Sequence, residues 1–271
     1  MKRMRLASFV FFFVAVVFGR AAAQAPRSAS IVVTTTLIET AIRDLLGDDI
    51  PVVRLLPPGS CPGHFDLEPG QVKSLSSATL FIRHDFQAGL DAGVAKSGLE
   101  TNRVVSVVSR PAFTIPGEYA AMCEELAVRL KQMWPDRTGR MNTRLDEIRR
   151  RAAAAEAGLA DRTGRLRGRK VLCARHQRDF CRWMGLDVVA VFEAGTDESA
   201  WQLNRAVDMA KTAGAEAVIG NRQWGSRHLD ALAEAAGLPG LMLSNFPDHG
   251  AAGAYWQLLD ANVSALLKGF P

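Results

Sequence analysis

Three of the five histidines in the sequence stand at the ends of apolar runs that we expect to be strands. His64 follows the run IPVVRLL, His84 ends the run TLFIRH, and His176 ends the run KVLCARH. In open parallel sheets, ligands bind beyond the carboxyl ends of the strands, where loops and helix N-termini converge. Neutral imidazole is a common ligand for zinc and similar ions, and three such groups leave a position for a carboxylate, a thiolate or water. The pattern therefore predicts a transition-metal site at His64, His84 and His176.

The loop that carries His64 has the composition of a stiff, pre-formed turn. Its prolines at 57, 58 and 62 fix the backbone and remove hydrogen-bond donors, while its glycines allow a sharp bend around Cys61 and His64. Such a loop presents a thiol and an imidazole at little entropic cost. The alternative explanation is a proline-rich turn with an incidental histidine. His84 and His176 have alternatives too, a backbone hydrogen bond at a strand end and a place at a helix start.

Cys61 and His64 also raise the hypothesis of a nucleophilic enzyme. A catalytic triad needs a nucleophile, a base beside it and a third group that orients the base, and this loop supplies two of these parts. We therefore expect a binding protein and no enzyme.

The first 25 residues have the order of a secretory signal: the basic stretch MKRMR, the apolar run LASFVFFFVAVVFG and the small-residue stretch AAAQA around the cleavage site. We expect a signal peptide at 1–23 and a mature chain that starts near Gln24. No second apolar run of roughly 18 residues follows, so we expect no stable membrane insertion of the mature chain.

The composition gives little support for nucleic-acid binding. The chain has 33 basic and 28 acidic residues, and four of the basic ones, Lys2, Arg3, Arg5 and Arg20, leave with the signal. The mature chain then keeps 29 basic residues and a formal charge of +1. Its four cysteines allow two disulfides in an exported protein, and the sequence leaves three pairings open.

Strand-like and helix-like segments alternate in two parts of the chain, which predicts two α/β lobes with parallel sheets. Between the lobes, apolar residues recur at helical spacing from Glu118 to about Leu166, and Pro135 should kink or break this helix. Forty-odd helical residues would reach about 60 Å, so we expect the helix to bridge the lobes. Strands are expected at 31–37, 50–56, 79–84, 102–109, 170–176, 187–192, 215–221 and 240–245. The predicted domains are the signal peptide at 1–23, an N-terminal lobe at 24–115, the bridging helix at 116–168 and a C-terminal lobe at 169–271.

These motifs resemble the periplasmic zinc and manganese solute-binding proteins of ABC transporters. The stretch IVVTTTLIETAIRDLLGDDIPVVRLLPPG resembles the family's opening strand, helix and strand, which lead to a Pro-Pro-Gly loop and then a metal-binding histidine at the position of His64. The segment HQRDFCRWMGLDVV resembles the one that carries a further ligand, at the position of His176. The WPDR break and the final YWQLLDANVSALL also match, so the resemblance covers nearly the whole mature chain.

The chain departs from the family pattern at the other ligands. The family's second histidine usually precedes the long helix in a Pro-His pair, where this chain has Pro-Gly-Glu at 116–118. The family's acidic ligand falls on Ser244, and the His-rich loop of many zinc members is absent. We expect His84 to replace a missing ligand, because it ends a strand at the correct edge. The candidates for the fourth ligand are water and four side chains that carry a thiol, a carboxylate or an imidazole: Cys61, Glu118, Asp248 and His249.

The resemblance implies a periplasmic solute-binding protein that captures a transition metal ion and delivers it to an ABC permease. Zinc is the first choice of metal, with manganese and iron(II) as alternatives, and we expect a monomer with no nucleic-acid partner. The missing ligands favour a second hypothesis, in which the same fold binds a metal chelate or an organic solute. Four tryptophans are candidates for aromatic contacts to such a solute, although core packing explains most of them: Trp183, Trp201, Trp224 and Trp256.

Overall fold

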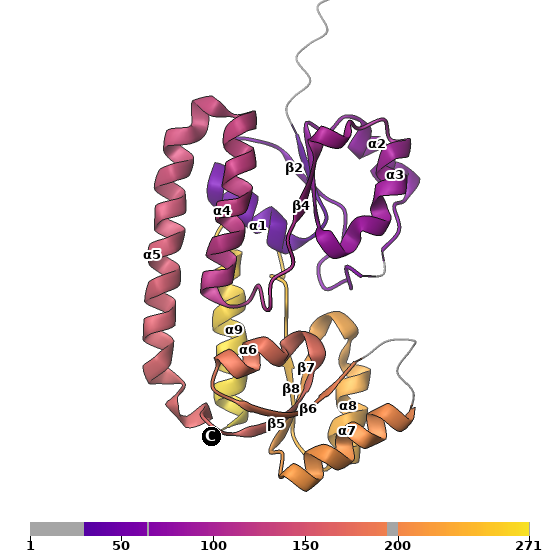
Figure 1. The fold of residues 1–271 in the computed structure, drawn as a ribbon, viewed down its shortest axis with the longest axis vertical. Helices are drawn as coiled ribbons and strands as arrows, with labels where there is room; N and C mark the ends of the chain where they lie inside the picture. Colours follow the sequence, from indigo (N-terminus) through magenta and orange to yellow (C-terminus); the bar gives the residue numbers. More distant parts are fainter. Residues whose placement is uncertain (1–29, 64, 194–199, 271) are drawn as a thin grey trace, which may run out of the picture.

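The computed structural model describes residues 30–63, 65–193 and 200–270. The predicted signal peptide and the predicted ligand His64 lie outside the described residues. The described chain forms two α/β lobes, one above the other in Figure 1, with the long helix α5 running beside both. Among the described helices, none is long and apolar enough to cross a membrane.

The first lobe is built on a four-stranded parallel sheet with the strand order β2-β1-β3-β4. Its elements are β1 (Ile31–Val33), α1 (Thr36–Leu46), β2 (Val52–Arg54), α2 (Pro69–Ser76), β3 (Leu80–His84), the 3₁₀ segment η1 (Asp85–Leu90), α3 (Asp91–Lys96), η2 (Thr101–Arg103) and β4 (Val104–Val107). Local signals set the ends of α1, since the Thr35 side chain accepts a hydrogen bond from the Ile38 amide and Gly47 follows at a φ of 78°. The four predicted strands of this lobe are present, each shorter than its predicted range.

The second lobe repeats this topology. Its sheet is also parallel, with the order β6-β5-β7-β8. Its elements are β5 (Lys170–Ala174), η5 (Arg175–Gln177), α6 (Arg178–Trp183), β6 (Asp187–Phe192), α7 (Ala200–Ala213), β7 (Ala217–Asn221), η6 (Arg222–Trp224), α8 (Ser226–Ala236), β8 (Gly240–Leu243) and α9 (Ala254–Gly269). In each sheet the first strand of the lobe lies between the second and the third strands, and the fourth strand pairs with the third at the far edge. The predicted pair of parallel α/β lobes is confirmed.

The chain between the lobes reverses direction at Pro135. Helix α4 (Pro116–Met133) ends at Trp134, η3 (Pro135–Arg137) makes the turn, and α5 (Thr138–Arg162) packs back along α4 before η4 (Gly164–Leu166) leads to the second lobe. The prediction that the helical segment reaches about 60 Å is therefore wrong, because two antiparallel helices replace one long helix. The break falls at Pro135, since proline lacks the amide hydrogen and its ring blocks the preceding turn. The 25 residues of α5 span about 37 Å, and α5 alone confirms the predicted bridging helix.

One hydrophobic core extends through both lobes. It contains buried side chains of β1 and β3, of α4 and α5, and of β5, β7 and α9. Tyr119 of α4 stacks on Tyr255 of α9, with ring centroids 3.8 Å apart, and thereby joins a helix from the middle of the chain to the C-terminal helix. Two smaller clusters cover the other face of each sheet. Because the lobes share one close-packed core, rotation of one lobe against the other disturbs contacts in both.

Candidate functional site

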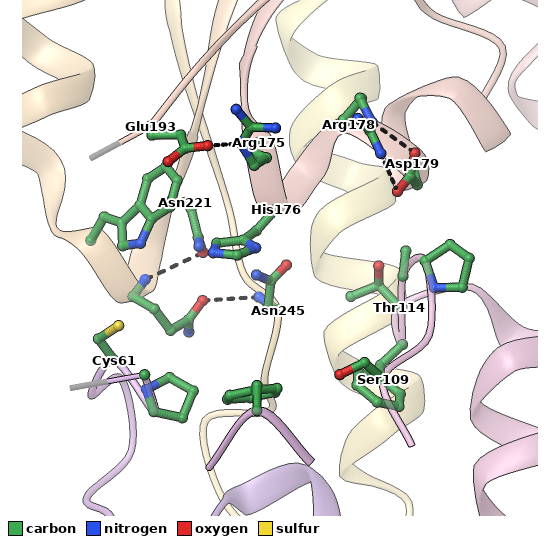
Figure 2. A pocket seen from close by; sticks show the side chains of 18 of the residues that line it. Cys61, Ser109, Thr114, Arg175, His176, Arg178, Asp179, Glu193, Asn221 and Asn245 are labelled. Carbon is green, nitrogen blue, oxygen red and sulfur yellow. Dashed lines mark hydrogen bonds and ion pairs between the residues drawn. The ribbon is translucent and has the colours of Figure 1, made fainter. Parts of the chain in front are cut away.

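A cavity of about 890 Å³ lies between the two lobes. Its walls come from segments that follow β2, β3 and β4 in the first lobe and β5, β6, β7 and β8 in the second. Parallel strands gather their connecting loops at one edge, and here the two edges line the same space. Figure 2 shows side chains that point into this space from both lobes. The predicted cleft between the lobes is confirmed.

His176 reaches the cavity from the second lobe. It is the middle residue of η5, directly after the buried strand β5, and its ring lies between Asn221 and Asn245 in Figure 2. The ring also contacts Trp224, with centroids 5.0 Å apart, and it stays accessible from the cavity. The surrounding protein atoms, together with the positive charge of Arg175, lower the pKa of His176. The ring is thus held in the neutral form that binds metal ions.

Carboxylates and arginines beside His176 are paired with one another. Arg175 forms an ion pair with Glu193, and the Nε atom of Arg178 lies 3.0 Å from an Asp179 carboxylate oxygen (Figure 2). Both carboxylates of the described cavity wall therefore already have an arginine partner.

The loop before His64 forms part of the opposite wall. Cys61, Pro62 and Gly63 line the cavity, whereas His64 itself lies outside the described residues. Gln87, a buried residue, fixes this loop because its Nε2 donates a hydrogen bond to the Pro62 carbonyl at 3.1 Å. The chain next to the predicted ligand is thereby tied to the segment that follows β3.

His84 is fully buried at the end of β3, beside the cavity. Its Nε2 lies 3.0 Å from the Thr35 hydroxyl, and its Nδ1 has no hydrogen-bond partner among the described residues. Three rings that line the cavity pack around the imidazole: Phe86, Phe113 and Phe246, with centroid distances of 5.0, 5.3 and 5.9 Å. Burial lowers the pKa of His84 to about 3, so the ring is neutral. The structure places His84 behind these rings, and its role as a ligand stays a prediction.

Ser244, which stands where the family pattern has an acidic ligand, belongs to a buried hydrogen-bond network. Its hydroxyl donates to the Phe246 carbonyl at 2.8 Å and accepts from Gln223 Nε2 at 2.9 Å. Gln223 also accepts from the Asn245 amide at 3.0 Å, and the Asn245 side chain accepts from Gln177 at 2.9 Å. This part of the structure is polar and carries no negative charge, and of its side chains Gln177 keeps an Oε1 without a hydrogen-bond partner among the described residues.

Of the four side chains considered for the fourth ligand, only Cys61 lines the cavity. Glu118 lies 3.4 Å from Arg110, Asp248 lies 2.8 Å from an arginine nitrogen, and His249 Nε2 lies 3.0 Å from a glutamine oxygen. Within the part of the chain that the structure describes, no group of three His, Cys, Asp or Glu side chains is arranged to hold a metal ion.

The sequence did not reveal most of the cavity wall. The segment 109–114 after β4 supplies a continuous stretch of it, including Arg110 and Phe113. The available signal was their position, because both follow a strand of the predicted sheet. Trp224 lines the cavity, whereas Trp201 is 64% exposed and the other two tryptophans considered as solute contacts lie outside the wall.

Two lobes of one topology, a bridging helix and a cavity between the carboxyl ends of both sheets define a two-lobed solute-binding protein. The chain belongs to the family described as zinc-uptake complex component A, periplasmic, whose model matches residues 31–269. The predicted resemblance and function class are therefore confirmed: this is a solute-binding component of a metal-uptake system. The family is a periplasmic family of transport proteins, not of enzymes, and it works with an ABC permease.

Solved structures of this kind are similar in fold. The periplasmic zinc-binding protein TroA from Treponema pallidum is 15% identical, with 90% of this chain and 99% of that chain covered at a TM-score of 0.75. FpvC from Pseudomonas aeruginosa in complex with Mn²⁺ is 17% identical, with 90% and 98% covered at a TM-score of 0.75. A zinc-bound deletion mutant of ZnuA is 17% identical, with 90% and 98% covered at a TM-score of 0.74. A comparison with curated protein sequences gives no match.

Proposed function

We propose that this chain captures a transition metal ion between its lobes, with His64 and His176 as nitrogen ligands and zinc as the first candidate metal. The supporting observation is that His176 lies in the cavity on one side while Cys61 and Gly63, close to His64 in the chain, line it on the other. One ligand would then come from each lobe. Manganese and iron(II) are the alternative metals, and the similar solved structures include zinc, manganese and nickel complexes.

We also propose that the chain is exported to the periplasm by its signal peptide, acts there as a monomer and delivers the metal to an ABC permease. The family to which it belongs supports the location and the permease. In this proposal the lobes present the loaded site to the membrane partner, and no step of the cycle makes or breaks a covalent bond.

Equilibrium dialysis of the mature, metal-stripped protein against zinc, manganese and iron(II) tests the proposal. We expect about one bound ion per chain for at least one metal. His64→Ala and His176→Ala should each weaken binding by at least roughly tenfold, the scale of effect seen when a metal site is disturbed. His228→Ala is the matched control, because His228 is exposed on α8, away from the cavity. No binding of any of the three metals, or equal affinities in the three variants, would contradict the proposal.

The same experiment tests the third predicted ligand. If His84 binds the metal, His84→Asn should weaken binding as strongly as His176→Ala does. If His84 only supports the rings in front of it, the effect should be much smaller.

A further inference from the structure

The cavity is much larger than the coordination shell of a bare metal ion. Zinc bonds to nitrogen and sulfur ligands at about 2.0–2.3 Å, so a closed four-ligand site encloses little more than the ion. The cavity measures about 890 Å³, the volume of roughly thirty water molecules in the liquid. Sites for small organic molecules usually measure about 300–1,000 Å³. The space therefore fits a solute that has an organic skeleton.

Aromatic rings from both lobes line this space. Phe86 and Phe113 come from the first lobe, and Trp224 and Phe246 come from the second. Phe86 stacks on His84 with ring planes 8° apart, and it is still 50% exposed. A solute that covers this exposed phenylalanine with an apolar or aromatic group lowers the free energy of the complex, because apolar surface is removed from water. A hydrated metal ion offers no such group, whereas an organic molecule does.

The charged side chains of the wall suit a solute that brings its own negative charge. Arg110, Arg175 and Arg178 line the cavity together with Asp179 and Glu193, and an arginine already pairs with each of these two carboxylates. A cation that enters alone finds no unpaired carboxylate on the described wall to offset its charge. An anion finds guanidinium groups that are paired with carboxylates too, but each guanidinium has five N–H donors and can bind a further carboxylate oxygen.

Arg110 is prepared to donate to such an anion. Its terminal nitrogens lie 3.4 Å from Glu118 and 3.3 Å from Glu125, two contacts that hold the guanidinium in place. Its Nε is buried and has no hydrogen-bond partner among the described residues. A buried donor without an acceptor is unfavourable, so the Arg110 side chain gains a hydrogen bond if its Nε turns toward a solute oxygen in the cavity that this residue lines.

We propose that the solute is an anionic metal chelate, a transition metal held by a small organic molecule with carboxylate or phenolate oxygens. The oxygens of the chelator accept hydrogen bonds from Arg110 and Arg178, its skeleton covers Phe86, and the metal takes His176 as a ligand. This inference rests on the proposed function, because His176 still binds the metal, and it adds the class of molecule that carries the metal.

Calorimetric titration of the metal-stripped protein with two forms of zinc separates the possibilities. One form is zinc chloride, and the other is zinc mixed one to one with citrate, nitrilotriacetate or 2,3-dihydroxybenzoate. Free chelator competes with a protein that binds the bare ion and lowers its apparent affinity. For a protein that binds the chelate, at least one chelator should instead raise the affinity by roughly tenfold or more, as expected for a new hydrogen bond to a charged group. Native mass spectrometry should then show zinc and chelator bound together.

Arginine variants test where the chelator binds. Arg178→Gln should weaken binding of the preferred chelate by roughly tenfold, while binding of zinc alone should not weaken, because the paired Asp179 is released. Arg182→Gln is the matched control, since Arg182 is exposed on the same helix, α6, but does not line the cavity. It should change neither affinity.

The outcomes separate this inference from the proposed function. If zinc alone binds at one ion per chain and every chelator weakens it, the proposed function stands and the chelate inference is overturned. Loss of zinc binding in Cys61→Ser without added chelator would also overturn the inference, because Cys61 would then supply the anionic ligand. If neither zinc nor any zinc chelate binds, both proposals are overturned.

Discussion

Replacing His84 with asparagine should make the protein less sensitive to mild acid. Burial lowers the pKa of His84 from its usual 6.5 to about 3 in the folded protein, whereas the unfolded chain exposes the ring to water. Between these two values the unfolded state binds a proton that the folded state does not. The free energy of unfolding therefore falls as the pH falls through 6.5 toward 3. Above pH 6.5 the ring is neutral in both states, so burial of the neutral ring there costs no stability through proton binding.

The size of the effect follows from this pKa difference. With a pKa of 6.5 in the unfolded chain, protonation of His84 stabilises that state by about 2 kcal/mol at pH 5 and hardly at all at pH 7. The folded state gains almost nothing over this interval. His84 alone should thus lower the free energy of unfolding by about 2 kcal/mol between pH 7 and pH 5.

Urea unfolding of the metal-free protein at pH 7, 6 and 5, followed by tryptophan fluorescence, measures this difference. In His84→Asn, or in His84→Gln if that variant folds better, the fall between pH 7 and pH 5 should be about 2 kcal/mol smaller than in the parent chain. His228→Asn removes an exposed histidine and should leave the parent slope unchanged. Equal slopes in the His84 variants and the parent would refute the argument that the ring is buried and neutral.

Two further predictions concern the packing that holds the lobes together. Gly250→Ala should lower the free energy of unfolding by about 1–3 kcal/mol, measured by chemical denaturation, because the new methyl group would overlap the Glu39 carboxylate. Gly158→Ala is its control, at an exposed helical position with open space around it. This second variant should raise the free energy of unfolding by about 0.5–1 kcal/mol. Tyr119→Phe should cost about 1–3 kcal/mol in the same assay, since it removes the hydroxyl that donates to the largely buried Asp44 carboxylate at 2.6 Å, and a cost near zero would contradict the assigned hydrogen bond.

Positions that follow predicted strands were the most informative part of the sequence. His176 lies in the cavity, as its place after an apolar run predicts, and Cys61 lines the opposite wall after β2. This worked because parallel β–α alternation decides which edge of a sheet carries the ligand-binding loops. The alternation itself is a local pattern that a sequence displays directly.

Features that depend on packing between distant segments could not be predicted in the same way. An apolar run that ends in His84 does not say whether the imidazole faces the cavity or lies behind other rings, and Phe246, which covers it, is far away in the chain. Pro135 predicted the helix break, but the reversal that follows depends on Leu126 and Leu145 packing into the shared core. Arg110 belongs to no sequence motif that would mark it as a cavity residue, because its position depends on contacts with two carboxylates of α4.

Trp224 gives the site an optical signal of its own. Its ring lies 5.0 Å from the His176 ring, and among the tryptophans of the described chain it is the one that lines this cavity. The emission of an excited indole responds to the protonation of a neighbouring imidazole and to a paramagnetic ion bound there. Arrival of a metal at His176 should therefore be visible in the fluorescence of the unlabelled protein. The aromatic contact that shapes the wall thus also makes occupancy of the cavity observable in real time.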